Sequence, residues 1–324
     1  MNTLTRYAFS YLPSTAKIGY LKSRGHVGHK AKIGFGSLIL AEHVEIADNV
    51  RVGVGTHIIA ETIKLGKRVW IGHRNQMRVR TLEMADDSEI TNDVTVGGMD
   101  SPDSRLSLGK RSSIMAHSFI NTTYPVEIGD DVGLGGYCKL FTHGSWQSPL
   151  DGYPIEFGPV KVGNGVWIPW DVFIMPNVTI GEGSTIGARA LVRSSIPPHS
   201  LAVGIPAKVI KSAPDYPKPL SQEERLCWVT RIMGDMQRYF TWKRAKITIR
   251  QDRAQGIWSI EKNGEDDVLV FDDTTEGISD PHVALKKGTD TLDLDKRWHR
   301  EIRDFLGRYG IRTQNVRGVD PGAM

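Results

Sequence analysis

The sequence has few cysteines and no long apolar run. Its two cysteines, Cys138 and Cys227, lie far apart without the spacing of a metal site, so neither a disulfide framework nor a zinc site is indicated. No stretch approaches the roughly 18 consecutive apolar residues of a membrane-spanning helix, and the N-terminal segment has too short and polar a core for a signal peptide. We therefore expect a cytoplasmic protein without an integral membrane segment.

The sequence also lacks a strong charge excess and a phosphate-binding loop. A net charge of +4 on 324 residues is too small to imply a nucleic-acid partner, although it suits a small polyanionic ligand. No G-x-x-x-x-G-K-[ST] motif occurs. The hydrophobic content of 40% and the charged content of 24% are ordinary for a globular protein, and the length allows two domains.

What the sequence does contain is a hydrophobic period of six. Aliphatic residues recur at every sixth position through residues 160–206, at Val162, Ile168, Ile174, Ile180, Ile186 and Val192. Period six is neither the 3.6 of an amphipathic helix nor the alternation of a strand. It therefore predicts a coil that returns to the same environment at every sixth residue, as in a solenoid.

Extended towards the N-terminus, the period gives a ladder of 24 positions, each of them Val, Ile, Leu or Met. In groups of three, the ladder residues are Val27, Ile33, Ile39; Ile46, Val52, Ile58; Leu65, Ile71, Met77; Met84, Ile90, Val96; Leu108, Ile114, Ile120; Ile128, Leu134, Leu140; Val162, Ile168, Ile174; Ile180, Ile186, Val192. Steps of six within each group, with steps of seven between the first four groups, predict eight three-sided coils.

Two features of each hexapeptide fit a narrow prism. The fourth residue after a ladder position is usually small or β-branched, as at Ser37 and Thr56, because little room remains beside the aliphatic side chain. Glycine often follows the ladder residue directly, as at Gly53, which we interpret as freedom for the chain to turn at a corner. Stacked coils would be joined by hydrogen bonds at a spacing of about 4.8 Å.

The pattern [LIV]-G-x-x-[STAV]-x and the segment IPPHSLAVGIPAKVI at 196–210 resemble the hexapeptide-repeat acyltransferases, and are similar to maltose, galactoside and polysaccharide O-acetyltransferases. The resemblance covers about residues 27–212. It implies a left-handed parallel β-helix, usually a homotrimer, and acetyl-CoA as the acyl donor. The handedness rests on the resemblance alone, because crossovers between parallel strands are normally right-handed.

We therefore expect a mainly β chain that ends in a small α+β domain. Ser221 and Glu224 form a capping box for a helix that ends near Phe240, with apolar residues on one side, namely Leu226, Val229, Met233, Met236 and Phe240. Short strands follow at 246–250, 256–260 and 268–271 around a turn at 263–264, and a second helix covers 295–309. The expected divisions are a lead-in at 1–26, the β-helix at 27–213 and an appendage at 214–324 that serves packing or assembly.

Two insertions, 97–107 and 141–161, interrupt the ladder. Both leave the third face of a coil, so they emerge from one corner, two coils or roughly 10 Å apart. Loops extruded from one side of a repeat array commonly form its binding surface. We place a small-molecule saccharide acceptor there, because carboxylates and aromatic rings suit sugar hydroxyls; the candidates are Asp100, Asp103, Trp146, Asp151, Tyr153 and Glu156.

His143, in Phe-Thr-His-Gly at the mouth of the longer insertion, matches the general base of the family. Imidazole can take the proton that the acceptor hydroxyl loses as it attacks a thioester. His117 is the rival, although it lies on the second face and suits a surface or interface role. Carbonic anhydrases of the same fold have two histidines five residues apart, and here Thr122 stands five after His117, so no metal is expected. Cys138 occupies a small buried position.

For the donor, the resemblance places Trp167 and Ala188 in the coenzyme A groove and Lys208 near the phosphates. Arg193 keeps a positive charge one residue before its usual place. The family usually continues Val-Trp-Ile with two small residues, whereas this chain has Pro169 and Trp170. Either the groove is reshaped, with Trp170 stacking on a ligand, or donor binding is weakened.

The resulting hypothesis is an acetyl-CoA-dependent O-acetyltransferase that acts on a saccharide or glycoside hydroxyl by direct transfer. Two alternatives stay open. One is N-acylation of an amino-sugar nucleotide on the same scaffold. The other is a catalytically silent β-helix that serves assembly or binding, which Pro169 and Trp170 favour and His143 opposes.

Overall fold

A computed structural model describes residues 8–252, 257–262, 265–271, 283–287, 290–291 and 297–311. The chain divides into two compact units, Met1–Lys218 and Pro219–Met324. We describe each unit by itself. In the described part of the chain, no helix combines the length and the apolar character needed to cross a bilayer.

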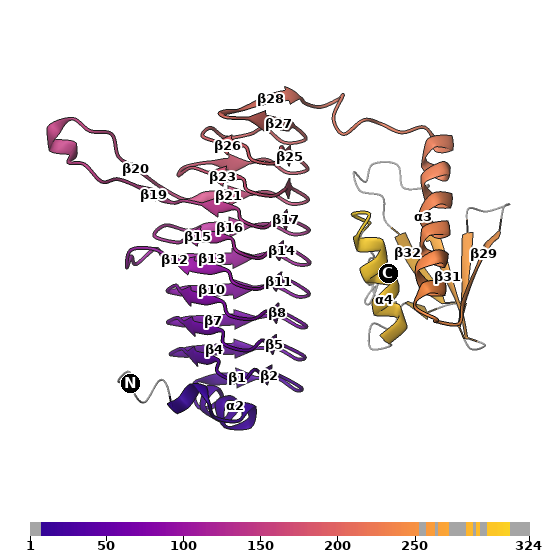
Figure 1. The fold of residues 1–324 in the computed structure, drawn as a ribbon, viewed down its shortest axis with the longest axis horizontal. Helices are drawn as coiled ribbons and strands as arrows, with labels where there is room; N and C mark the ends of the chain where they lie inside the picture. The colour runs from indigo at the N-terminus through magenta and orange to yellow at the C-terminus, as the bar shows by residue number, and fades with distance from the viewer. Residues whose placement is uncertain are drawn as a thin grey trace, which may run out of the picture. The chain divides into compact units, whose positions relative to one another are not determined.

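The first unit is a parallel β-helix whose coils stack as three sheets (Figure 1). The first sheet contains β1 (Gly25–Val27), β4 (His43–Ile46), β7 (Thr62–Leu65), β10 (Thr81–Met84), β13 (Arg105–Leu108), β16 (Val126–Ile128), β21 (Val160–Val162) and β24 (Thr179–Ile180). The second contains β2 (Lys32–Ile33), β5 (Arg51–Val52), β8 (Trp70–Ile71), β11 (Glu89–Ile90), β14 (Ser113–Ile114), β17 (Gly133–Leu134), β22 (Trp167–Ile168), β25 (Thr185–Ile186), β27 (Leu201–Gly204) and β28 (Ala207–Lys211). The third contains β3 (Leu38–Leu40), β6 (His57–Ile59), β9 (Gln76–Arg78), β12 (Thr95–Gly97), β15 (Phe119–Asn121), β18 (Lys139–Leu140), β23 (Phe173–Ile174) and β26 (Leu191–Val192).

The ladder is confirmed as the core of this unit. All 24 predicted positions are buried, and each sheet pairs the ladder residues of successive coils in register, as Val27 pairs with Ile46 and Ile33 with Val52. Most of a ninth coil follows the eight that were predicted, because Ile196 bridges to Ile180 and Ala202 pairs with Ile186. The step from Val192 to Ile196 is four residues rather than six, which is why the period alone ended one coil early.

The corners of the coils differ from the expectation for glycine. The left-handed conformation lies three residues after the ladder position, usually at a non-glycine residue, for example Arg68 at φ 60° and Asp131 at φ 58°. The glycine directly after a ladder residue is needed for close approach instead. A Cβ at Gly53 would lie 2.5 Å from the carbonyl oxygen of Gly72 on the next coil. Glycine there allows the coils to stack, whereas the turn itself is made elsewhere.

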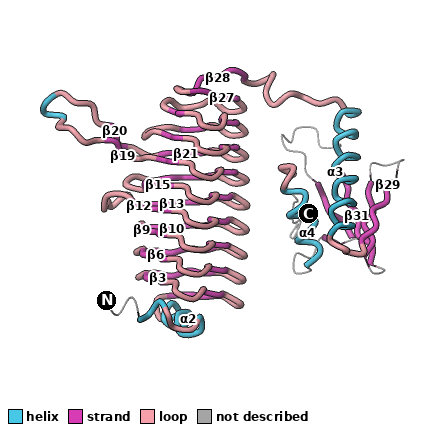
Figure 2. Tube along the Cα trace, in the orientation of Figure 1, coloured by secondary structure: helices cyan, strands magenta, loops and turns pink. Residues whose placement is uncertain are grey.

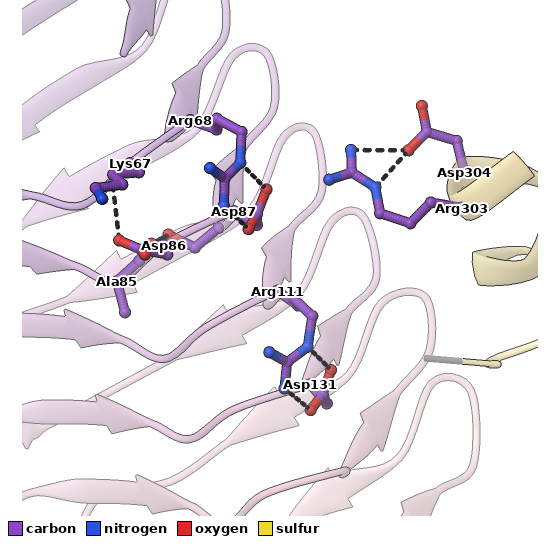
Figure 3. A network of polar contacts seen from close by, with 10 residues as sticks. Lys67, Arg68, Ala85, Asp86, Asp87, Arg111, Asp131, Arg303 and Asp304 are labelled. Carbon is purple, nitrogen blue, oxygen red and sulfur yellow. Dashed lines mark hydrogen bonds and ion pairs between the residues drawn. The ribbon is translucent and has the colours of Figure 1, made fainter. Parts of the chain in front are cut away.

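Paired charges bridge neighbouring coils at these corners (Figure 3). Arg68 donates two hydrogen bonds to the carboxylate of Asp87, at 2.7 and 2.6 Å, and Arg111 binds Asp131 through the same two nitrogens. One residue earlier, Asp86 accepts a 2.7 Å hydrogen bond from the backbone N–H of Lys67. The corners at Arg68 and Arg111 are each tied to the next coil by a bidentate pair and, one residue earlier, by a backbone contact.

Polar side chains continue this linkage inside the prism. Ser37, Thr56 and Asn75 occupy equivalent buried positions on three successive coils. Ser37 Oγ accepts from the N–H of Thr56 at 3.0 Å, and Thr56 Oγ1 accepts from the N–H of Asn75 at 3.2 Å. Asn75 then accepts from the N–H of Val94 at 2.8 Å and donates to the carbonyl of Thr91 at 2.7 Å. Polar side chains at the small interior position therefore also satisfy backbone groups in the connections between the second and third sheets.

Helix α2 (Ser14–Lys22) covers the N-terminal end of the β-helix. Leu21 packs into the core of the coils, and Ser14 Oγ accepts a 2.9 Å hydrogen bond from the N–H of Ile33. Lys17 is 1% exposed and donates to the carbonyl oxygen of Gly34 at 2.9 Å. Burial lowers the pKa of its amine. The helix thus satisfies backbone groups that the first coil would otherwise leave open.

The second unit packs helices against an antiparallel sheet, and Figure 2 separates its helices and strands by colour. Helix α3 (Gln222–Trp242) begins with the predicted capping box of Ser221 and Glu224. Met233, Met236 and Phe240 are buried, whereas Leu226, in the first turns of the helix, is 47% exposed. The other elements are β29 (Ile247–Asp252), β30 (Ile257–Lys262), β31 (Glu265–Phe271), β32 (Val283–Lys287), β33 (Asp290–Thr291) and α4 (Arg297–Gly307). The last two strands were not predicted, and the expected turn at 263–264 lies outside the described residues.

Candidate active site

The longer insertion forms an arm, residues 141–159, that projects from the β-helix between β18 and β21 (Figure 1). Its base is a short antiparallel ribbon of β19 (His143–Gly144) and β20 (Glu156–Phe157), in which His143 pairs with Phe157. The 3-10 turn η1 (Pro149–Asp151) lies in the distal part of the arm. The shorter insertion also leaves the third sheet, two coils earlier and on the same side in Figure 1.

The base of the arm is fixed to the β-helix by hydrogen bonds around Thr142. This side chain is fully buried; its hydroxyl accepts from the N–H of Tyr124 at 3.0 Å and lies 2.9 Å from Oδ1 of Asn121. The N–H of Gly158 donates to the carbonyl of Thr142 at 3.0 Å. Asn177 donates to the carbonyl of Phe157 at 2.9 Å. Both strands of the ribbon are therefore held where they leave the coils.

His143 stands at this fixed base rather than in the distal part of the arm. Its imidazole is half-buried and stacks on the ring of Phe157, with centroids 5.1 Å apart and planes 14° from parallel. Its Nε2 lies 3.3 Å from the hydroxyl of Ser145. A ring held on one face with a hydroxyl beside Nε2 is oriented for proton exchange at that nitrogen.

The predicted acceptor residues of the arm lie farther from its base. Trp146, Asp151 and Tyr153 are all exposed, Trp146 at 99% and Tyr153 at 46%. Within the described chain, no hydrogen bond, ion pair or ring contact joins any of them to His143. A single copy of the arm therefore does not bring these residues together with the imidazole. Leu150, which was not predicted, is also exposed, at 95%.

The shorter insertion encloses a small cleft of about 250 Å³ against the second and third coils. Asp100 lies in its wall, 3.6 Å from Arg78, and Arg80 pairs with Glu61 at 2.7 Å in the same wall. Asp103 is exposed and does not line the cleft. Of the two predicted carboxylates in this insertion, Asp100 alone contributes to the wall of this cleft.

The predicted donor residues lie on the last coils. Trp167 is 59% exposed on β22, and Ala188, Arg193 and Lys208 are exposed as well. The side chain of Tyr216, which was not predicted, returns to this region and hydrogen-bonds the hydroxyl of Thr185, the neighbour of Trp167 in the sheet. The segment after β28 is thus anchored beside the predicted donor surface.

Trp170 belongs to an aromatic column of His117, Tyr137 and Trp170 on three successive coils. The rings of His117 and Tyr137 are stacked with centroids 4.8 Å apart, and that of Trp170 lies 5.7 Å from Tyr137. Trp170 also lies over Gly136, where a Cβ would come within 2.9 Å of the indole. The indole is 57% exposed. Trp170 therefore takes space that a small residue would leave open and fills it with a flat apolar surface.

Cys138 lies beside the predicted donor surface. Cys138 is fully buried and donates from Sγ to the carbonyl of Pro169 at 2.9 Å, and burial raises the pKa of its thiol to about 11. A thiol in this state is a poor nucleophile near neutral pH. Among the residues described, no group of three or more histidine, cysteine, aspartate or glutamate side chains could hold a metal ion.

Residues 159–194 match the family of bacterial transferase hexapeptide repeats. A Schizosaccharomyces pombe protein that is provisionally named an acetyltransferase is 47% identical to this chain over 91 residues. These residues are 26% of this chain and 42% of that protein. One of Mycobacterium tuberculosis, also provisionally named, is 36% identical over 111 residues, or 33% of this chain and 37% of that protein. The chain thus spans about two fifths of the length of the curated relatives it matches.

Solved structures are similar to part of the chain. A galactoside acetyltransferase in complex with coenzyme A is 29% identical, covers 40% of this chain and 66% of its own, and has a TM-score of 0.32. A hexapeptide-repeat acetyltransferase of Vibrio cholerae is 18% identical over 65% of this chain and 88% of its own, with a TM-score of 0.30. The resemblance to hexapeptide-repeat transferases is confirmed by the family match and the curated relatives.

Proposed function

We propose that the protein is an acetyl-CoA-dependent O-acetyltransferase that acts on a hydroxyl of a saccharide or glycoside. The observation that carries this proposal is the position of His143 at the hydrogen-bonded base of the arm, directly before the coils that match the transferase family. The curated relatives, provisionally named acetyltransferases, support the reaction class. The saccharide acceptor rests on the carboxylates and aromatic side chains of the two insertions.

In the proposed reaction, the neutral imidazole of His143 takes the proton of the acceptor hydroxyl as its oxygen attacks the acetyl carbonyl carbon. A carbon–oxygen bond forms, the carbon–sulfur bond of the thioester breaks, and the imidazolium returns the proton to the departing sulfur. No covalent acetyl-enzyme forms, in keeping with the burial of Cys138. Phe157 would hold the imidazole plane, and Ser145 would hydrogen-bond Nε2 until the acceptor arrives.

We further propose that coenzyme A lies along the last coils, with Trp167, Trp170 and Ala188 along the pantetheine arm. Arg193 and Lys208 are exposed cations on the same coils and would attract its phosphates. A homotrimer fits this arrangement, because the exposed arm would then reach a neighbouring copy. The apolar side chains of Trp146 and Leu150 would lose contact with water in that contact.

A first experiment is calorimetric titration of coenzyme A and acetyl-CoA into the wild type, His143→Ala and the paired variant Arg193→Gln with Lys208→Gln. We expect saturable binding by the wild type and by His143→Ala, and at least tenfold weaker binding by the paired variant because it loses two phosphate contacts. A panel of hydroxyl and amino-sugar acceptors then separates O-acetylation from N-acylation.

One observation favours a second candidate, a β-helix without catalysis. Trp170 occupies the space over Gly136 in the region proposed for the pantetheine arm. If neither coenzyme A nor acetyl-CoA binds the wild type at millimolar concentration, the enzyme proposal fails and the scaffold replaces it. If both bind but no acceptor is acetylated, acetyl-CoA hydrolysis with and without His143 tests the base separately.

A further inference from the structure

Several outward-facing cations of the β-helix are paired with a carboxylate on a neighbouring coil. The sheets and corners carry such pairs along much of their length: Lys64–Glu83, Arg80–Glu61, Arg68–Asp87, Arg74–Asp93, Arg111–Asp131, Lys161–Glu127 and Lys139–Asp171. Coils stack at about 4.8 Å, so an unbalanced charge would meet its neighbour at short range. Opposite charges on adjacent coils remove that repulsion.

As far as the structure describes the chain, Lys32 and Arg51 form no such pair, and they lie next to each other at the N-terminal end of the second sheet. They are direct neighbours on adjacent strands, β2 and β5, and both side chains are exposed. The next residue in the column is Trp70, so no carboxylate follows Arg51. Glu89 lies one strand further and accepts a 2.8 Å hydrogen bond from Ser113. In the described chain, two cations therefore stand together without an ion-pair partner.

These cations line a cleft of about 610 Å³ between helix α2 and the second sheet. Ile18, Val54 and Trp70 give the cleft apolar walls. Every described residue that lines it is neutral or basic. The volume is in the range of small-molecule sites, which are mostly apolar with a few placed polar groups.

Two more donors face the same cleft. The Nδ1 of His73 accepts a hydrogen bond from the N–H of Val54 at 3.0 Å, so the neutral ring carries its proton on Nε2 and can donate it. Ser14 Oγ accepts from the N–H of Ile33 at 2.9 Å, which leaves its own hydroxyl proton to donate. The cleft therefore combines apolar walls, two cations and two neutral donors, and this set matches an anion with an apolar body.

We propose that this cleft binds a small organic anion, a phosphate or a carboxylate, whose charged group lies between Lys32 and Arg51 and whose apolar body rests on Trp70. The anion supplies the negative charge that carboxylates supply elsewhere on the β-helix. The site lies on the first three coils, whereas His143 follows the sixth. The proposal is independent of the acetyltransferase reaction and of the coenzyme A surface.

The test uses the full chain and ligand-observed NMR titration with phenyl phosphate, benzoate and the neutral benzyl alcohol. We expect saturable binding of at least one anion and at least tenfold weaker binding of the alcohol. Lys32→Gln and Arg51→Gln should each weaken anion binding about tenfold, because each removes a charged hydrogen-bond donor. Lys22→Gln is the matched control, since Lys22 is an exposed lysine of α2 outside the cleft, and it should bind as the wild type does. Tighter binding of phenyl phosphate than of benzoate would identify the source as a phosphate, and the reverse as a carboxylate.

Arg51→Glu separates a binding role from a merely structural one. The new carboxylate would pair with Lys32, so the melting temperature should stay the same or rise by about 1 °C while anion binding is lost. The proposal is overturned if the wild type binds neither anion at millimolar concentration, or if benzyl alcohol binds as tightly as the anions. It is equally overturned if Arg51→Glu keeps wild-type anion affinity.

Discussion

Asn75→Ala should destabilise the β-helix far more than the same change at a half-buried asparagine. Asn75 is fully buried and makes two side-chain hydrogen bonds to the next coil, to the N–H of Val94 at 2.8 Å and the carbonyl of Thr91 at 2.7 Å. Losing each bond costs about 1 kcal/mol, and each buried backbone group left without a partner costs about 1 kcal/mol more. We therefore expect a loss of about 4 kcal/mol in the free energy of unfolding.

Asn92→Ala is the matched control, in the connection between the second and third sheets on the next coil. Asn92 is half-buried and accepts one hydrogen bond, from the N–H of His73 at 2.8 Å, and water can replace this partner. Its loss should cost about 1 kcal/mol. Urea denaturation of both variants, followed by circular dichroism of the β-sheet signal, measures the difference. Equal losses at the two positions would refute the view that interior polar side chains bind the coils together.

Three other outcomes follow from single side chains. At pH 8, a thiol reagent should label the exposed Cys227 and leave Cys138 unmodified until the protein unfolds, because burial raises the pKa of Cys138 to about 11. Mass spectrometry of the labelled peptides measures the two rates, and similar rates would disprove this expectation. Burial lowers the pKa of Lys17, so the unfolded state keeps the proton of this amine to higher pH than the folded state does. The free energy of unfolding of the wild type should therefore increase as the pH rises from the lowered pKa towards 10.5. Thermal melts of Lys17→Met should not show this increase. Phe240→Ala should cost the second unit about 3 to 5 kcal/mol and Leu226→Ala less than about 1 kcal/mol; similar losses would contradict their different burial.

The hydrophobic period was sufficient to predict eight of the coils and their register, because burial of one aliphatic residue per face is the same condition at each of these turns. It could not predict handedness, which comes from the resemblance alone. The interior role of Asn75 was also missed, since the rule for small side chains did not foresee a polar side chain that bonds two backbone groups of the next coil. The sixfold register did contain a signal for the aromatic column, because His117 and Tyr137 both stand three residues after a ladder position.

The candidate site was predictable where it depends on the order of the strands along the chain. It was less predictable where a segment outside the repeat packs onto the coils or projects from them. His143 follows the last strand of a coil, so its place at the base of the arm follows from the ladder. The contact of Tyr216 with Thr185 could not be predicted, because it depends on the path of a proline-rich segment after the repeat ends. The spread of Trp146 and Tyr153 away from His143 depends on the ribbon of the arm, which has no hydrophobic period.

The central claim is that His143 acts as a general base in acetyl transfer. The measurement that tests it most directly is the rate of coenzyme A release from acetyl-CoA, with an acceptor that the wild type acetylates, for the wild type, His143→Gln and the control His117→Gln. We predict that His143→Gln lowers kcat at least 100-fold with acetyl-CoA affinity within about twofold of the wild type, while His117→Gln stays within about threefold in kcat. A His143→Gln protein that keeps more than about a third of the wild-type kcat would contradict the assignment.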